Sequence, residues 1–129
     1  MIQTIGVIGA GQMGNGIAQV AACAGYDVVM IDIKDEYVEK GLGTIQFSLG
    51  KLVSKERMTQ ADADAALARI KTGTDRSMCA DCDLVVEAVP EVLSLKQDIF
   101  TELDSICKPE TILASNTSSI SITTIAAST

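Results

Sequence analysis

Short apolar runs alternate along the chain with segments in which apolar residues recur every three or four positions. The runs lie at residues 3–8, 28–31, 83–89 and 111–114, with a short candidate at 71–75. They lack strict apolar–polar alternation, which is typical of strands that are buried on both faces of a parallel sheet. Strands that alternate with helical segments in this way predict an α/β fold with a doubly wound parallel sheet.

The first helical segment is predicted to end before Gly25, because glycine is common just past helix ends. One face of this helix is apolar and is expected to face the core, namely Met13, Ile17, Val20 and Ala24. Cys23 is expected in the core as well. Residues 77–81 are interpreted as a loop or one helical turn, and apolar spacing predicts a further helix over 95–106.

A long insertion follows the second predicted strand. Its apolar residues keep helical spacing, which predicts an amphipathic helix at about 35–54 with a stripe of Val38, Leu42, Ile45, Leu49 and Leu52. Thr59 is predicted to be a helix N-cap, with Asp62 three residues later, and a second, shorter helix is predicted to reach about residue 70. Together they predict an inserted helical hairpin at about 35–70.

Composition narrows the class of protein. Apolar residues make up 47% of the 129 and aromatic residues only 3%, so the one domain expected over 1–129 has a small-residue aliphatic core. The net charge is −7, and no basic stripe suggests nucleic-acid binding. No apolar run reaches the length of about 18 residues that predicts a membrane span. Because the start of the chain also lacks a secretory pattern, we expect a cytoplasmic protein.

Four cysteines and the absence of histidine limit the metal and redox chemistry. Cys79 and Cys82 have CxxC spacing, which would suit a redox pair or half of a zinc site. Zinc would need two further ligands, and histidine cannot supply them. We interpret the cysteines, Cys107 included, as reduced and buried thiols, and we expect no metal site.

The most informative motif is Gly-Ala-Gly-Gln-Met-Gly at 9–14. It follows the first predicted strand and opens the first predicted helix, and Asp32 ends the next strand about 20 residues later. This context predicts that N–H groups at the helix start bind a dinucleotide pyrophosphate. Gly9 permits the tight turn, Gly11 lets the phosphates approach the backbone, and Gly14 lets the helix lie close to the sheet.

The acidic residue predicts which dinucleotide is bound. The carboxylate of Asp32 would accept hydrogen bonds from the adenosine-ribose hydroxyls and would repel a 2′-phosphate, which favours NAD over NADP. Lys34 lies close by and weakens this preference. Gln12 and Met13 in the loop are further candidate cofactor contacts. Two alternatives stay open here, because FAD-binding proteins share the glycine fingerprint and a glycine turn also occurs in α/β proteins of other function.

Four segments together resemble the N-terminal domain of the 3-hydroxyacyl-CoA dehydrogenase family. They are the glycine-loop segment at 9–19, the helical hairpin after Asp32, Val-Val-Glu-Ala-Val-Pro-Glu at 85–91, and Ala-Ser-Asn-Thr-Ser-Ser at 114–119. Their order and spacing resemble the family along essentially the whole chain. The resemblance implies a Rossmann-type fold, NAD as cofactor and an acyl-CoA substrate.

The resemblance also implies roles for single residues near the nicotinamide. Glu91 and Lys96 match family positions that contact NAD. Ser118 matches a serine that contacts nicotinamide and substrate and would support catalysis by donating a hydrogen bond to the substrate's 3-oxygen. Asn116 in the same loop would orient the nicotinamide end. The alternatives are an acidic residue in a helix's first turn for Glu91 and a helix-capping loop for Ser118.

Two residues of the predicted hairpin match family positions that bind coenzyme A. They are Ser48 and Lys55, with Lys51 between them on the same polar face of the helix. Such a stripe could meet the phosphates of coenzyme A. The alternative is an ordinary solvated helix face.

The family's catalytic histidine lies beyond residue 129, in a His-Phe-x-Asn-Pro motif, and this sequence contains no histidine. The resemblance therefore implies the NAD-binding part of an enzyme that interconverts (3S)-3-hydroxyacyl-CoA and 3-oxoacyl-CoA in fatty-acid or butanoate metabolism. The C-terminal substrate and dimerisation domain would be absent, so we expect the chain alone to be inactive and the whole enzyme to be a homodimer. The alternatives are a stand-alone NAD-binding module and another NAD-dependent β-hydroxyacid dehydrogenase.

Overall fold

Five parallel strands form one sheet in the order β3-β2-β1-β4-β5 in the computed structural model, which describes residues 2–89 and 93–115. All four neighbouring pairs are parallel. The strands are β1 (Thr4–Ile8), β2 (Asp27–Ile31), β3 (Ile70–Gly73), β4 (Leu84–Glu87) and β5 (Ile112–Ser115). The predicted α/β class is confirmed. The chain runs outward from β1 in both directions, so the strand order reverses between β1 and β4, where ligands of such sheets bind.

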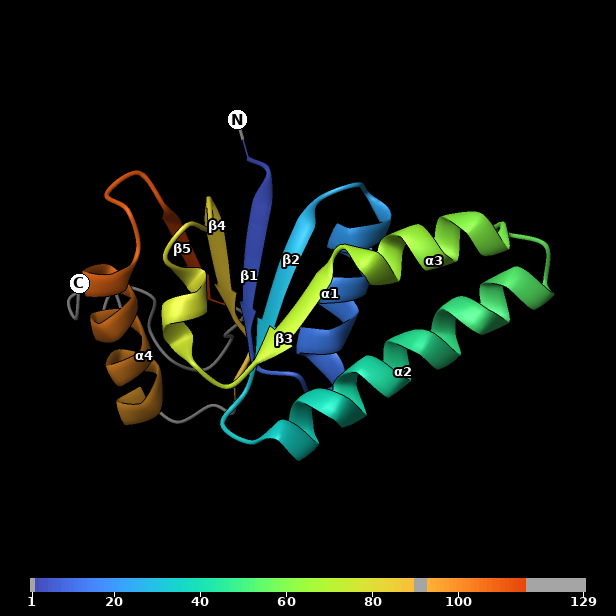
Figure 1. Ribbon diagram of the computed structural model, residues 1–129. Coiled ribbons are helices and arrows are strands. Elements are labelled where there is room, and N and C mark those ends of the chain that lie inside the picture. Colours follow the sequence, from blue (N-terminus) through green and yellow to red (C-terminus); the bar gives the residue numbers. More distant parts are fainter. Residues whose placement is uncertain (1, 90–92, 116–129) are drawn as a thin grey trace.

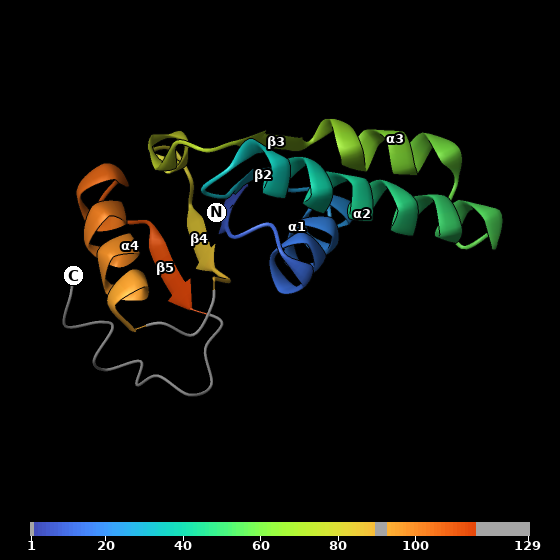
Figure 2. The ribbon, with the colours of Figure 1, turned by 90° about the horizontal axis from the view of Figure 1, so that it is seen from below.

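Helices cover both faces of the sheet (Figures 1 and 2). They are α1 (Gln12–Cys23), α2 (Asp35–Ser54), α3 (Gln60–Ala68) and α4 (Leu93–Ile106), with a short 3-10 turn η1 (Arg76–Cys79). Figure 1 shows α1, α2 and α3 on one side of the sheet and η1 with α4 on the other. The sheet is therefore doubly wound, as predicted.

Each face of the sheet has its own aliphatic core. Alternate residues of β1 divide between the two, because successive side chains of a strand point to opposite faces. Val7 packs into the core that α1, α2 and α3 cover, and Ile8 packs into the core beneath α4. Buried aliphatic residues of the helices complete them: Ala18 and Ile45 in the first core, Ile99 and Leu103 in the second.

Of the apolar face predicted for α1, Ile17 packs against the core, but the other predicted positions are wrong. Met13 and Val20 are 58% and 71% exposed, and Cys23 is exposed as well. The buried face instead consists of small residues, namely Gly14, Asn15, Ala18, Ala21 and Ala22. The reason is the close approach of α1 to the first turn, because a Cβ on Gly14 would lie 1.7 Å from the carbonyl oxygen of Gly9. Only small side chains fit between helix and sheet at this distance.

The predicted hairpin is present between β2 and β3. Thr59 is the N-cap of α3, and its side-chain oxygen accepts a hydrogen bond from the backbone N–H of Asp62 at 3.1 Å. Ile70 departs from the prediction, because it begins β3 and pairs with Val28 of β2 rather than ending the helix. The strand ladder replaces the helical hydrogen bonds that this residue would otherwise make.

The remaining predictions about the fold concern cysteines, metals and membranes. Cys79 and Cys82 are buried, as expected, and Cys107 is half-buried. Within residues 2–89 and 93–115, no cluster of three or more potential ligand side chains is placed to hold a metal ion. In the same ranges, no helix has both the length and the apolar character needed to cross a membrane.

Candidate functional site

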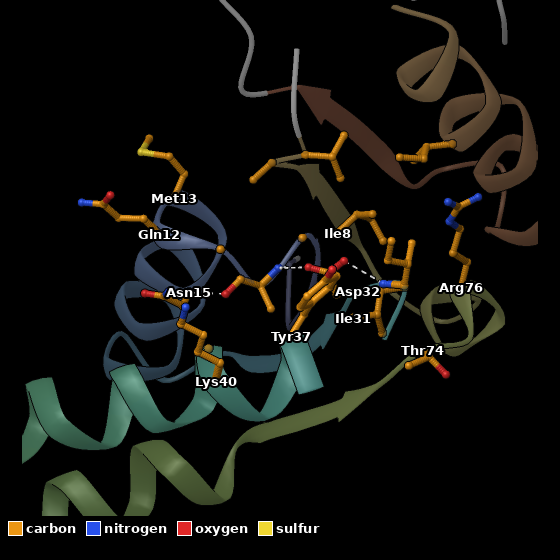
Figure 3. A pocket seen from close by; sticks show the side chains of 18 of the residues that line it. Ile8, Gln12, Met13, Asn15, Ile31, Asp32, Tyr37, Lys40, Thr74 and Arg76 are labelled. Atoms are coloured by element: carbon orange, nitrogen blue, oxygen red, sulfur yellow. Dashed lines mark hydrogen bonds between the residues drawn. The ribbon is translucent and has the colours of Figure 1, made fainter. Parts of the chain in front are cut away.

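A cleft of about 1390 Å³ lies at the carboxyl edge of the sheet. It is bounded by the glycine loop, the residues after β2, the first half of α2, the β3–η1 connection, and the junction of β4 with α4. Figure 3 shows Gln12 and Met13 on one side, Thr74 and Arg76 on the opposite side, and Asp32 between them. The cleft is therefore built where the strand order reverses, the position expected for a ligand of an open α/β sheet.

The three glycines of the loop differ in what surrounds them. Gly9 has φ +110°, and a Cβ there would lie 2.6 Å from the carbonyl oxygen of Ala88. Gly14 allows α1 to touch the turn, as described above. Gly11 is different, because a Cβ there would meet no atom within 4 Å. The space at Gly11 is open toward the cleft, which is the surrounding that a closely approaching ligand requires.

The N-terminus of α1 opens directly onto this space. Gly11 is its N-cap, and no side chain among the described residues caps it. The first N–H groups of a helix lack intrahelical partners and carry a partial positive charge. Gln12 and Met13 are exposed in this first turn and line the cleft. The arrangement fits an anionic group such as a pyrophosphate.

Asp32 follows β2 and ties it to the glycine loop. Its Oδ2 accepts a hydrogen bond from the backbone N–H of Ala10 at 2.9 Å, and its Oδ1 accepts from Ile33 at 2.7 Å (Figure 3). These bonds fix the orientation of the carboxylate. A carboxylate has about four acceptor positions, so the remaining positions can accept hydrogen bonds from ligand hydroxyls. The geometry fits the ribose contact predicted from the sequence.

Some residues of the site were not predicted. Gly41 of α2 packs against the glycine loop, because a Cβ there would lie 2.5 Å from the carbonyl oxygen of Ala10. Asn15 is buried, and its Nδ2 donates to the same oxygen at 3.4 Å. A glycine inside a strongly periodic helix is the sequence signal for Gly41. Asn15 among small apolar residues is a comparable signal.

A carboxylate at the far wall has a pKa below its usual range. Asp75 lines the cleft and is the N-cap of η1. The backbone N–H of Ser77 donates to its Oδ1 at 2.9 Å and lowers the pKa of Asp75 by stabilising the charged form. Next to it, Arg76 forms an ion pair with Glu102 of α4 at 2.5 Å. This ion pair joins η1 to α4 across the edge of the cleft.

Lys96 lies in the first turn of α4 and is fully buried. Its Nζ donates to both carboxylate oxygens of Glu87 at 2.8 Å. The sequence predicted Lys96 at this edge of the sheet but not its partner Glu87, whose signal was an acidic residue ending an apolar strand. Contact of Lys96 with NAD stays a prediction.

Three predicted site residues lie outside the described residues. They are Glu91, Asn116 and Ser118, and their roles stay predictions. Ser48 and Lys55 are described and lie far along α2 from the glycine loop, outside the residues that line the cleft.

Of the predicted coenzyme A positions, Ser48 contacts α1, and Lys55 lies at the C-terminal end of α2. Ser48 is half-buried, and its Oγ accepts a hydrogen bond from Nε2 of Gln19 at 3.0 Å. Lys55 is the exposed C-cap residue of α2. Lys51 places its Nζ 5.5 Å from the ring centroid of Phe47, a side chain that is 70% exposed. The face carries cationic groups, but its role in binding coenzyme A stays a prediction.

Known proteins resemble the whole chain. A family model described as "3-hydroxyacyl-CoA dehydrogenase, NAD binding domain" matches residues 4–129. A probable 3-hydroxybutyryl-CoA dehydrogenase of Deinococcus radiodurans is 57% identical over 121 residues, which cover 94% of this chain and 43% of that protein. The 3-hydroxybutyryl-CoA dehydrogenase of Bradyrhizobium diazoefficiens is 50% identical over 129 residues, covering 100% of this chain and 44% of that protein.

A solved structure shows the same fold. The crystal structure of (S)-3-hydroxybutyryl-CoA dehydrogenase from Ralstonia eutropha matches with a TM-score of 0.97 and 50% identity. The match covers 100% of this chain and 46% of that chain. The chain thus spans less than half the length of the relatives it matches.

Proposed function

Because the chain belongs to the NAD-binding domain family of the 3-hydroxyacyl-CoA dehydrogenases, we propose that it supplies the NAD site of an enzyme that oxidises (3S)-3-hydroxyacyl-CoA to 3-oxoacyl-CoA or catalyses the reverse reaction. NAD, when bound, accepts the hydride that leaves C3 of the substrate. The observation that carries the proposal is the open space at Gly11 beside the uncapped start of α1, with the carboxylate of Asp32 fixed next to it.

Each end of the cleft would hold a different part of the cofactor. The N-terminus of α1 would bind the pyrophosphate through backbone N–H groups, as its partial positive charge favours. Asp32 would accept the ribose hydroxyls and disfavour a 2′-phosphate, which selects NAD over NADP. Glu91 and Lys96 would contact the cofactor as well, in line with the family resemblance. These residues bind and orient the cofactor, and no proton transfer is assigned to them.

The acyl-CoA would be held partly by the α2 face. Ser48 and Lys55 are proposed to contact coenzyme A, with Lys51 adding a second positive charge beside them. Ammonium groups can form strong, charge-assisted hydrogen bonds with phosphate, which supports this assignment. Ser118 is proposed to donate a hydrogen bond to the 3-oxygen, and Asn116 to orient the nicotinamide end.

The general base is proposed to come from another part of the whole enzyme. This sequence contains no histidine, so the imidazole that the family resemblance implies cannot come from it. We therefore expect the chain alone to bind NADH without reducing acetoacetyl-CoA. The homodimeric state and the cytoplasmic location of the whole enzyme are also proposals.

Binding and turnover measured on this chain test the proposal. Titration of NADH, followed by its fluorescence, should show saturable binding that is tighter than binding of NADPH. Calorimetric titration with coenzyme A should show weaker binding to Lys55→Ala than to the matched control Lys71→Ala, which removes an exposed lysine from β3. Absence of NADH binding to the folded chain would refute the cofactor site. Equal coenzyme A affinities in the two variants would refute the assignment of Lys55, and acetoacetyl-CoA reduction by the chain alone would refute the assignment of the base.

A further inference from the structure

The wall of the cleft between β4 and α4 rests on a buried ion pair. Glu87 is the last residue of β4, and Lys96 lies nine positions later, in the first turn of α4. Both side chains are 0% exposed, and Lys96 Nζ lies 2.8 Å from each carboxylate oxygen. The pair therefore joins the end of a central strand to the start of the helix that follows it.

Stability alone does not explain this pair. Removing two charges from water carries a large desolvation penalty, which mutual attraction often only balances, so apolar residues in the same place are often as stable or more so. Lys96 also stands at the end of α4 where the helix dipole disfavours a positive charge. Because desolvation and the helix dipole both disfavour the pair, we infer that it has a role in placing neighbouring groups rather than in stability alone.

The Glu87 carboxylate accepts hydrogen bonds from a backbone amide as well as from Lys96. Its Oε2 also accepts a hydrogen bond from the backbone N–H of Val89 at 2.7 Å. The intervening residue, Ala88, donates its N–H to Ile8 of β1 at 2.8 Å, and its carbonyl oxygen lies against Gly9. A single buried carboxylate thus fixes the turn out of β4 where it meets the glycine loop.

Residues at or beside the two groups that this carboxylate binds line the cleft. Ala88 and Val89 follow Glu87 directly, and Leu95 precedes Lys96 on α4. Displacing the carboxylate by one methylene group would shift both sides of this wall. A misplacement of about 1 Å can lower the rate of an enzyme by roughly 10²-fold, and a cofactor that lies against a shifted wall loses contacts as well.

We propose that Glu87 is a positioning residue for NAD: by holding Lys96 and the amide of Val89, it sets the wall of the cleft against which the cofactor lies. Glu87 itself does not touch the cofactor. The inference rests on the proposed occupation of this cleft by NAD.

Four variants of the chain test the inference, each studied for NADH affinity and for the midpoint of urea unfolding. Glu87→Asp keeps the charge but retracts the carboxylate, and it should raise the Kd for NADH about tenfold, which corresponds to about 1.4 kcal/mol of binding free energy. Glu87→Gln and Lys96→Met each remove one charge of the buried pair and keep the other, so both should also lower the unfolding midpoint.

The double variant Glu87→Gln/Lys96→Met separates positioning from stability. Because both charges of the pair are removed in it, its unfolding midpoint should recover toward that of the unchanged chain. Its Kd should stay raised, and by no more than the larger of the two single changes, because both residues act through one wall. A purely structural pair in which Lys96 makes no contact with NAD would instead recover affinity together with stability. The positioning role of Glu87 itself is therefore measured by Glu87→Asp and Glu87→Gln, which leave Lys96 in place.

A matched control is present at the other end of β4. Asp83 precedes the strand and pairs with Lys108 Nζ at 2.6 Å, away from the residues that line the cleft. Asp83→Asn should lower the unfolding midpoint and leave the Kd for NADH unchanged.

The outcomes separate failure of the proposed NAD site from failure of the positioning role of Glu87. If the unchanged chain does not bind NADH, the proposed cofactor site fails. If the unchanged chain binds NADH and Glu87→Asp binds it equally well, or if the double variant recovers affinity, the positioning role alone is overturned. Additive effects of the two single changes would also overturn it, because they would indicate that Glu87 acts independently of Lys96.

Discussion

Replacing Gly11 by alanine adds one methyl group that should weaken NADH binding and leave the stability of the fold almost unchanged. The backbone of Gly11 has φ −69° and ψ −168°, which alanine adopts without strain. The added Cβ meets no protein atom within 4 Å, so the fold can accept it. Alanine is a poorer N-cap than glycine, which destabilises the helix. Alanine also lowers the conformational entropy of the unfolded chain, which stabilises the folded state by about 0.4–1 kcal/mol. These opposing effects should keep the change in unfolding free energy within about 1 kcal/mol.

The effect on NAD binding should be much larger. The methyl group would occupy the space through which the pyrophosphate approaches the N-terminus of α1. Loss of about two charge-assisted hydrogen bonds at roughly 1.5–3 kcal/mol each amounts to about 3–6 kcal/mol. The Kd for NADH should therefore rise by roughly 10²- to 10⁴-fold.

Fluorescence titration with NADH and urea unfolding, performed on the same protein samples, measure the two effects. Gly43→Ala is the matched control, because Gly43 is exposed within α2 and a Cβ there also meets no atom within 4 Å. This control should keep its affinity for NADH. Gly14→Ala would not serve, because its Cβ would collide with the Gly9 carbonyl. Unchanged NADH affinity in folded Gly11→Ala would refute the assignment of the pyrophosphate to this loop.

Three further substitutions test the charge of Asp32, the N-cap of α3 and the ion pair of Asp83 with Lys108. Asp32→Asn should weaken NADH binding and narrow the preference for NADH over NADPH in paired titrations; an unchanged ratio would contradict the role of the charge. Thr59→Ala removes the N-cap bond to Asp62 and should lower the unfolding free energy by about 1 kcal/mol without changing NADH affinity; no loss of stability in urea would count against the cap. The Lys108 ammonium lowers the pKa of Asp83 below its usual 3.8, so the stability that Asp83→Asn removes should be full above that value and shrink as pH falls further; a difference in melting temperature that does not vary with pH would contradict this.

The order of elements could be predicted because the signals for it are local. Apolar runs and helical periodicity depend on neighbouring residues, and α2 has the predicted length. The orientation of α1 could not be predicted in the same way. The contact of Gly14 with Gly9 brings α1 so close to the sheet that Val20 faces outward, although its spacing placed it inward. The exposed position of Cys23 has the same cause.

In the candidate site, too, the features with a local sequence signal could be predicted, and those that depend on packing could not. The glycine loop and Asp32 were predicted because their spacing within one βαβ unit reflects the chemistry of pyrophosphate and ribose binding. The hydrogen bond from the backbone N–H of Ala10 to the Asp32 carboxylate joins the glycine loop to the end of β2. The pairing of Glu87 with Lys96 was not predicted, because burial and the partner of a charged residue depend on how the strand and helix pack.

NAD is proposed to bind in the cleft between the glycine loop and Asp32. A crystal structure of this chain grown with NAD tests it most directly. Pyrophosphate density is expected over the N-terminus of α1 at Gly11, with the adenosine ribose within hydrogen-bonding distance of the Asp32 carboxylate. Cofactor density elsewhere on the chain, or a ribose that makes no contact with Asp32, would contradict it.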